Sequence, residues 1–248
     1  MLSFVSFLDD IYEVAVSIRL LVHFICASIC VVYYSEGYSL FRGELPQTID
    51  ISLSIIGLVF FLNIFNFLDG IDGISALQSA HLAITAILLC IIRDKVVINI
   101  DIVFYTSSLM LGCSLGFLIF NWNPAKIFLG DVGSTFFGFI HGLNLLLIAS
   151  SSERLFLASV IASLYYIADG GLTIIIRIFK REKIWLPHLN HFFQQAVRKG
   201  MGHKEVVLKI SVCNSILLFC SVMSIYMPHI AIVVSFLSTT WLLIHFQE

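Results

Sequence analysis

Aspartate residues gather in three short polar motifs of an otherwise apolar chain. The first is the pair Asp9-Asp10, the second places Asp69 and Asp72 in NIFNFLDGIDGIS, and the third places Asp131 in NWNPAKIFLGDVGSTFFG. An ionisable group at membrane depth costs free energy, so acids in apolar surroundings are functional candidates. If the three motifs meet at one membrane face, their carboxylates form a site of the kind that binds a divalent metal and phosphate.

Each motif also has a simpler interpretation when taken alone. Asp9-Asp10 is then a solvated pair near an N-terminal end, helped by a helix dipole. The Asp-Gly steps of the second motif are then turns that cap a helix. The segment from Gly130 to Ser134 is then a loop with Ser134 as N-cap, although the same geometry presents free backbone N–H groups to an anion. The joint occurrence of the three motifs is what favours a common site.

A fourth polar segment, residues 178–209, is basic and contains three histidines. Its simpler interpretation is an anchor that lies on anionic lipid. Its functional interpretation is that the cations neutralise a diphosphate while the histidines hydrogen-bond its oxygens. The cations are Arg181, Lys183, Arg198 and Lys199, and the histidines are His188, His191 and His203. Zinc is disfavoured, because two histidines separated by two residues, without a cysteine or an acid at ligand spacing, make a poor zinc site.

The elements that position these motifs are predicted to be membrane-spanning helices. The chain has 248 residues, of which 59% are hydrophobic and only 12% charged, with a mean hydropathy of +0.98, whereas about a quarter of the residues in soluble domains are charged. This composition excludes a water-soluble α/β enzyme and a disordered chain, and a net charge of -2 excludes a nucleic-acid binder. The six cysteines lie in apolar runs, without a Cys-x-x-Cys pair, and read as small buried side chains.

Eight stretches are long and apolar enough to cross a bilayer, for which about 20 residues are needed. They are residues 18–34, 50–67, 76–92, 102–120, 134–150, 155–178, 206–226 and 227–246. We therefore predict an all-α fold, a polytopic integral membrane helical bundle with about eight transmembrane helices, and a single domain over residues 1–248.

The basic residues predict the orientation of this bundle. With eight spans, the four motif segments and both termini fall on the same side of the membrane. Of the 14 lysine and arginine residues, four fall on the opposite side, namely Arg42, Arg93, Lys95 and Arg154. The positive-inside rule places the richer side, with the motifs, in the cytoplasm.

The ordered motifs resemble those of a known family. Asp9-Asp10 is followed by Arg19-Leu20, then by Asn63-x-x-Asn66-Phe67-x-Asp69-Gly-x-Asp72-Gly, then by Asn121-x-x-Pro124-Ala125-x-x-Phe128-x-Gly130-Asp131-x-Gly133-Ser134, and finally by the histidine segment. In this order they resemble the polyprenyl-phosphate N-acetylhexosamine-1-phosphate transferases of glycosyltransferase family 4. That group includes the enzymes that start enterobacterial common antigen and O antigen, and the peptidoglycan translocase.

The resemblance implies an activity and its partners. It implies transfer of a sugar 1-phosphate from a UDP-sugar to undecaprenyl phosphate, with release of UMP, in cell-wall or O-antigen and lipopolysaccharide synthesis. It implies Mg²⁺, with Mn²⁺ as the alternative, a bacterial inner membrane, and an active site that faces the cytoplasm; a homodimer is left open. The physical requirement fits, because reaction between two phosphates needs charge neutralisation and positioning.

The resemblance also implies roles for individual residues. Asp131 binds the metal with Asn66 beside it, and Asp9 and Asp10 bind the lipid phosphate, assist the metal or accept a proton. Phe67, Asp72, Asn121 and Phe128 are implied to surround the uridine. His188 and His191, with the nearby Arg181 and Lys183, are implied to hold the diphosphate and sugar, and Asn66 and Asp69 are further substrate-binding residues.

Two departures from the family pattern leave alternatives open for the activity and for the substrate. Family members usually have two further spans before the Asp-Asp pair, so the alternative to an active transferase is a truncated member whose transfer is weak or absent unless the missing spans are supplied in cis or as a second polypeptide. Asn190 stands where the translocase branch has a histidine, and His188-x-x-His191 resembles a branch acting on 6-deoxy-N-acetylhexosamines. The competing class is a membrane transporter, which also uses intramembrane acids but places them near the midplane.

Overall fold

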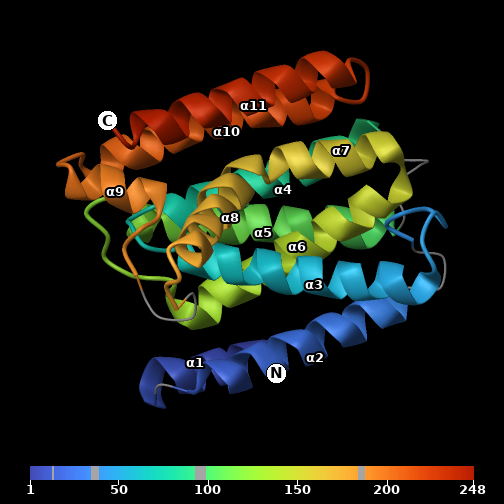
Figure 1. Ribbon diagram of the computed structural model, residues 1–248, viewed down its shortest axis with the longest axis horizontal. Helices are drawn as coiled ribbons and strands as arrows, with labels where there is room; N and C mark the ends of the chain where they lie inside the picture. Colours follow the sequence, from blue (N-terminus) through green and yellow to red (C-terminus); the bar gives the residue numbers. More distant parts are fainter. Residues whose placement is uncertain (13, 35–38, 93–98, 184–187) are drawn as a thin grey trace.

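The protein is an all-α bundle (Figure 1). The computed structural model describes residues 1–12, 14–34, 39–92, 99–183 and 188–248, and these residues form helices but no strand. Within these ranges, seven helices are long and apolar enough to cross a membrane, and the helices Glu153–Ala162 (α7) and Leu164–Phe179 (α8) pass the same test together. The chain is therefore a multi-pass membrane protein, with eight spans when that pair is counted as one.

The helix bounds follow the predicted stretches closely. The long helices are α2 (Val16–Tyr34), α3 (Gln47–Phe67), α4 (Ile74–Ile92), α5 (Ile100–Asn121), α6 (Gly130–Ser151), α10 (His203–Met223) and α11 (Pro228–His245). The shorter helices are α1 (Leu2–Tyr12), α7 (Glu153–Ala162), α8 (Leu164–Phe179) and α9 (Phe192–Arg198).

The span predicted over residues 155–178 is not one straight helix. It breaks at Ser163 into α7 and α8, whose axes differ by 68°. The hydroxyl of Ser163 donates to the carbonyl oxygens of Ser159 at 2.9 Å and Val160 at 3.2 Å. A serine that bonds back to the preceding turn competes with the backbone ladder and bends helices. The apolar pattern alone does not reveal this break.

Helix α1 was not predicted, and it changes the interpretation of the Asp9-Asp10 pair. The two aspartates lie near the C-terminal end of α1, which packs against α6. The helix dipole disfavours carboxylates at a C-terminal end, so the expectation of a pair stabilised by the dipole is wrong. Asp131, by contrast, lies in the first turn of α6, where the dipole favours a negative charge.

The motif segments share one end of the bundle (Figure 1). The end of α1, the α3–α4 and α5–α6 links, helix α9 and the C-terminus lie at this end, whereas the α2–α3, α6–α7 and α10–α11 links lie at the other. The predicted grouping of the motifs is thus confirmed. Arg93 and Lys95, used in predicting the orientation, lie outside the described residues.

A glycine contact joins α3 to α6 and fixes the frame of the site. A Cβ at Gly138 of α6 would lie 2.8 Å from the Cβ of Phe65 and 2.9 Å from the Cα of Leu62, both on α3. A Cβ at Gly142, four residues later, would lie 2.7 Å from Cδ1 of Leu58. Small residues at this spacing let two helix backbones approach closely within a membrane. The contact brings the C-terminal end of α3 to the start of α6.

Candidate functional site

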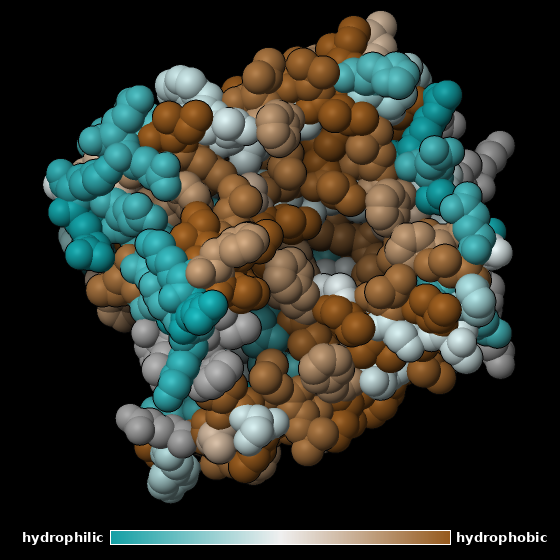
Figure 2. Space-filling view, in the orientation of Figure 1, coloured by the Kyte–Doolittle hydropathy of each residue, from teal (hydrophilic) through white to brown (hydrophobic). Residues whose placement is uncertain are grey.

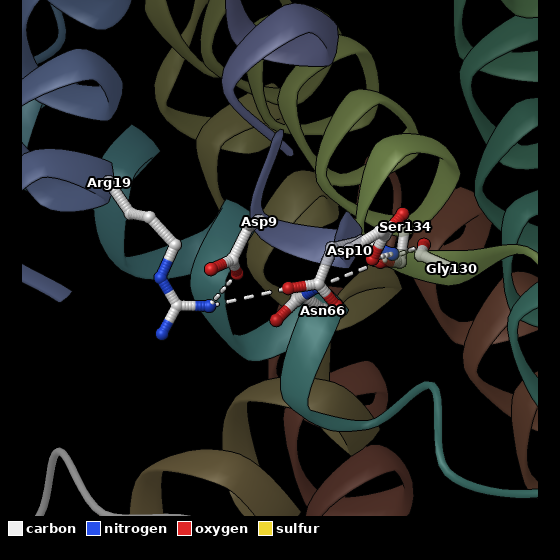
Figure 3. A network of polar contacts seen from close by, with 7 residues as sticks. Asp9, Asp10, Arg19, Asn66, Gly130 and Ser134 are labelled. Carbon is white, nitrogen blue, oxygen red and sulfur yellow. Dashed lines mark hydrogen bonds and ion pairs between the residues drawn. The ribbon is translucent and has the colours of Figure 1, made fainter. Parts of the chain in front are cut away.

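Asn66 and Asp131 connect α3 to α6 at the motif end. The Asn66 Nδ2 atom donates to Oδ1 of Asp131 at 3.0 Å and to Oγ of Ser134 at 2.8 Å (Figure 3). The Ser134 hydroxyl donates in turn to the Gly130 carbonyl at 2.8 Å. The carboxylate of Asp131 is therefore held in one orientation by a neighbouring helix.

Arg19 and the pair Asp9-Asp10 complete this cluster. The Arg19 Nη1 atom forms an ion pair with Asp9 and lies 3.3 Å from Oδ2 of Asp131. Asp10 accepts from the backbone N–H of Asp131 at 3.3 Å, and Figure 3 shows it beside Gly130. Gly130 has a φ of +65°, and a Cβ there would lie 3.1 Å from Oδ2 of Asp10. The structure thus brings the first and third motifs into direct contact at a glycine whose positive φ and short distance to Asp10 disfavour a side chain.

The link between α3 and α4 carries the second motif into the same site. Burial raises the pKa of Asp69 to about 6; a hydrogen bond from Ser75 opposes this shift, and the nearby charge of Asp131 adds to it. Asp69 therefore lies within electrostatic reach of the Asp131 cluster. A Cβ on the adjacent Gly70 would lie 3.0 Å from Cζ of Phe193, so the same link packs against the start of α9.

Asp72 holds the α5–α6 link and the start of α10. Its Oδ2 accepts from Nδ2 of Asn123 at 2.7 Å and from the N–H of Ala125 at 3.1 Å, and its Oδ1 lies 3.5 Å from Nδ1 of His203. Burial alone would raise the pKa of Asp72, but these hydrogen bonds and His203 together place that pKa below its usual value. Asp72 is thus an ionised cross-link between three segments.

Asn121 is a second cross-link between segments of the site, whereas the two aromatic residues predicted to bind uridine are exposed. The buried Asn121 accepts from the N–H of Gly73 at 2.9 Å and donates to the carbonyl of Ile127 at 2.9 Å. Phe67 is 42% exposed and Phe128 is 75% exposed. A uridine ring could therefore reach these aromatic rings, whereas the amide of Asn121 already bonds two backbone groups. The uridine-binding roles of all three residues stay predictions.

Asp169 anchors the histidine segment, and the sequence reasoning did not single it out. It is fully buried on α8 and accepts from the N–H groups of Phe192 at 3.0 Å and Phe193 at 3.2 Å. It also accepts from the Tyr165 hydroxyl at 3.2 Å and lies 3.2 Å from Nδ1 of His191. One signal could have found it, because it is an acid inside the apolar stretch 155–178.

His188 stacks near this anchor in a neutral form. Its ring centroid lies 4.8 Å from that of His191, and its Nδ1 accepts from the N–H of Asn190 at 3.3 Å. Burial, and then the neighbouring His191 and Arg177, lower the pKa of His188 to about 4. His188 is therefore uncharged at neutral pH and offers hydrogen bonds rather than a positive charge.

The cations near the histidines differ in burial. Arg181 and Lys183, the two predicted to hold the diphosphate, are exposed. Arg177 is only 5% exposed, pairs with Glu182 at 2.8 Å, and donates to the carbonyl of Lys183 at 2.9 Å. It lines a cavity of about 190 Å³ together with Arg198. Arg177 was not predicted, because a basic residue at a helix end also fits a membrane anchor.

The acidic cluster fits a divalent cation. Asp9, Asp10 and Asp131 meet beside Asp69, and Arg19 is the cation that pairs with them in the described part of the chain. Nowhere in the described part of the chain are three acid, histidine or cysteine side chains arranged to hold a metal by themselves. Mg²⁺ usually takes one or two carboxylates and fills its other positions with water and substrate phosphates. The excess negative charge around Asp131 meets that requirement, whereas Asn66 faces Asp131 with its nitrogen.

An apolar groove leads from the cluster into the bundle. It has a volume of about 390 Å³ and runs between α2, α3, α6 and α8, with Arg19, Asn66 and Asp131 lining its polar end. Val59, Phe60 and further side chains, most of them apolar, line its remainder. Figure 2 shows that the surface of the molecule, seen in the orientation of Figure 1, is covered largely by hydrophobic side chains. Such a groove suits a ligand with an anionic head and a long hydrocarbon tail.

Comparison with known proteins assigns the family. Residues 1–150 match the model of glycosyl transferase family 4, which is more than half of the chain. The chain belongs to this family. The resemblance inferred from the four motifs is thereby confirmed.

Similar proteins transfer amino-sugar phosphates, by the names they carry. A probable undecaprenyl-phosphate N-acetylglucosaminyl 1-phosphate transferase of Bacillus subtilis is 28% identical and covers 82% of this chain. A phospho-N-acetylmuramoyl-pentapeptide-transferase of Wolbachia is 28% identical and covers 89%. A decaprenyl-phosphate N-acetylglucosaminephosphotransferase of Mycobacterium leprae is 30% identical and covers 73%. The matched part of this chain spans 57%, 72% and 50% of these three relatives, respectively.

Proposed function

We propose that the protein transfers an N-acetylhexosamine 1-phosphate from a UDP-sugar to a polyprenyl phosphate in a bacterial inner membrane. The observation that carries this proposal is the apolar groove that ends at the Asp9, Asp131 and Arg19 cluster. A soluble donor can reach the cluster from the end of the bundle, while a lipid acceptor can reach it along the groove. The excess of basic residues on the motif side supports a site that faces the cytoplasm.

The reaction balances as a phosphoryl exchange. An oxygen of the lipid phosphate attacks the sugar-bearing phosphorus of the UDP-sugar, and the bond from that phosphorus to the bridging oxygen breaks, so UMP leaves with the bond electrons. Bound Mg²⁺ supplies charge neutralisation for the two phosphates. Asp131 is the residue we expect to hold it. Asn66, which also donates to the Ser134 hydroxyl, orients the carboxylate.

The other residues of the site orient the reactants. Arg19 lies where it can neutralise the acceptor phosphate at the mouth of the groove. The exposed ring of Phe128 suits stacking with uridine, and neutral His188 suits hydrogen bonds to the diphosphate or sugar. Asp72 and Asn121 hold the links that carry these groups. Positioning of this kind contributes much of the rate in phosphoryl transfer.

Replacement of Asp131 by Asn tests the proposal. We expect Asp131→Asn to abolish transfer of radiolabel from UDP-N-acetylglucosamine to undecaprenyl phosphate, with little loss of folded protein, because the side chain neutralises charge rather than packs. The matched control is Asp101→Asn, an exposed acid in the first turn of α5 at the opposite end of the bundle. EDTA should abolish transfer by the wild-type protein, and added Mg²⁺ should restore that transfer. Wild-type turnover by the Asp131→Asn variant would contradict the assignment.

A further inference from the structure

A second polar level lies inside the groove, deeper than the carboxylates. His23 of α2 and Asn63 of α3 line the groove together with Arg19 and Asn66. His23 follows Arg19 by four residues and Asn63 precedes Asn66 by three, so each pair lies on one helix face, about one turn apart. Two facing helices thus present a polar level at the mouth and another one turn further in.

The imidazole of His23 has an unused hydrogen-bonding atom. His23 is 7% exposed, and its Nδ1 has no hydrogen-bond partner among the described residues. The Asn63 side chain hydrogen-bonds the imidazole and donates to the carbonyl of Val59 at 2.7 Å. Buried polar atoms in native proteins are almost always paired, and an unpaired one lining a groove indicates a ligand contact.

The chemistry of the groove limits what that ligand is. The hydrocarbon tail of a polyprenyl phosphate offers no hydrogen-bond acceptor, whereas its phosphate offers several terminal oxygens. Arg19 offers a positive charge for that phosphate at the polar end of the groove, and His23 lies one turn deeper on the same helix face. A neutral imidazole donates from one ring nitrogen and accepts at the other, so Nδ1 of His23 is the donor in the tautomer whose Nε2 accepts from the Asn63 amide. A bond from such a donor to an anion is stronger than one between neutral groups.

We propose that Nδ1 of His23 donates a hydrogen bond to the phosphate of the acceptor lipid and sets its depth in the groove. This inference rests on the proposed function and adds a binding residue to it. Arg19 at the mouth and His23 below it hold two of the terminal oxygens. The third oxygen is then directed to the Asp131 end, where the donor diphosphate binds. His23 acts on the acceptor and not on the donor.

Three variants test this assignment in the purified 248-residue protein. His23→Phe keeps the ring and removes both nitrogens, whereas His23→Asn restores an N–H group near the position of Nδ1. His229→Phe is the control, because His229 is exposed at the start of α11, at the opposite end. The measurement is the KM for undecaprenyl phosphate and the KM for the UDP-sugar, each with kcat.

His23→Phe should raise the KM for undecaprenyl phosphate about 10- to 100-fold, as loss of a hydrogen bond to a charged group predicts. The KM for the UDP-sugar should change less than about twofold, and His23→Asn should recover most of the loss. Equal rises in both KM values, or no recovery in His23→Asn, would show that His23 only packs the groove. The control should match the wild-type protein.

A binding measurement separates this inference from the proposed function. Detergent-solubilised protein is mixed with undecaprenyl phosphate or with undecaprenol, which has the same tail and no phosphate. The wild-type protein should prefer the phosphate, and His23→Phe should lose about 10-fold of that preference. An unchanged preference in His23→Phe overturns the role of His23 and leaves the transferase function standing. A wild-type protein that binds the phosphate selectively but transfers nothing overturns the proposed function alone, and absence of any preference overturns both.

Discussion

Replacement of Asp169 by Asn should disconnect the histidine segment from the bundle. The carboxylate receives hydrogen bonds from the Phe192 and Phe193 N–H groups and the Tyr165 hydroxyl, with His191 at 3.2 Å. Asn has nearly the same volume, but it is neutral and places an N–H₂ group where one oxygen stood. The Phe193 N–H and the Tyr165 hydroxyl then face a donor in place of an acceptor.

The size of this effect follows from the bonds that change. The two hydrogen bonds to the remaining oxygen, from the Phe192 N–H and from His191, lose their charged acceptor, which costs about 1 kcal/mol each. A buried N–H group left without a partner costs about 1–3 kcal/mol more. The sum is about 4 kcal/mol, which corresponds to about a 1000-fold shift in the local equilibrium of the segment. We therefore expect transfer activity to fall at least about 100-fold. We also expect trypsin to cleave faster after Arg198, the last residue of α9, and after Lys199, which follows it.

Asp50 provides a matched control for that experiment. It is 3% exposed and accepts from the N–H groups of Leu40 at 3.0 Å and Phe41 at 2.9 Å, and from the Ser39 hydroxyl at 2.7 Å. It lies in the first turn of α3 at the opposite end of the bundle. Asp50→Asn should lower the thermal midpoint about as much as Asp169→Asn but retain transfer activity. Equal activity in the two variants would refute the anchoring argument.

Three further predictions concern charge, backbone and orientation. His188→Gln should reduce transfer by a factor that is constant between pH 6 and 8, because burial keeps the pKa of His188 near 4. That lowered pKa also means that the folded state loses stability as pH falls from about 6.5 towards 4, and thermal melts of His188→Gln should lose less over this range. Gly130→Ala should reduce transfer about 10-fold or more without unfolding the protein, since the added Cβ meets Asp10 and φ is +65°; unchanged kinetics would remove that contact from the site. A cysteine at Ser151 should react with an impermeant thiol reagent applied outside intact cells and one at Gln195 should not, and reversed labelling would invert the proposed orientation.

Hydropathy and motif order predicted most of what forms the site. A bilayer requires long apolar helices, so their number and approximate ends are fixed by length and composition alone. Alternation of spans then placed Asp10, Asp69 and Asp131 at one end, and the structure brings them within hydrogen-bonding or electrostatic reach. The prediction succeeded here because topology, rather than any single contact, gathers the motifs.

Local geometry was harder to predict because it depends on single side chains. The break at Ser163 depends on one hydroxyl, and apolar residues continue on both sides of it. Helix α1 has only 11 residues and is therefore shorter than a membrane span. Asp169 was overlooked because its partners, the backbone N–H groups of residues 192 and 193, come from a segment more than 20 residues away. Sequence spacing does not encode such a contact.

The glycine contact between α3 and α6 determines which parts of the protein can move during a catalytic cycle. Two helices whose backbones touch at Gly138 and Gly142 cannot slide past one another without steric overlap, so they form a rigid unit. Asn66 and Asp131 belong to that unit. Arg19 of α2 contacts it through a polar side chain instead. We expect any closure around the substrates to change the separation between Arg19 and Asp131, while the separation between Asn66 and Asp131 stays constant.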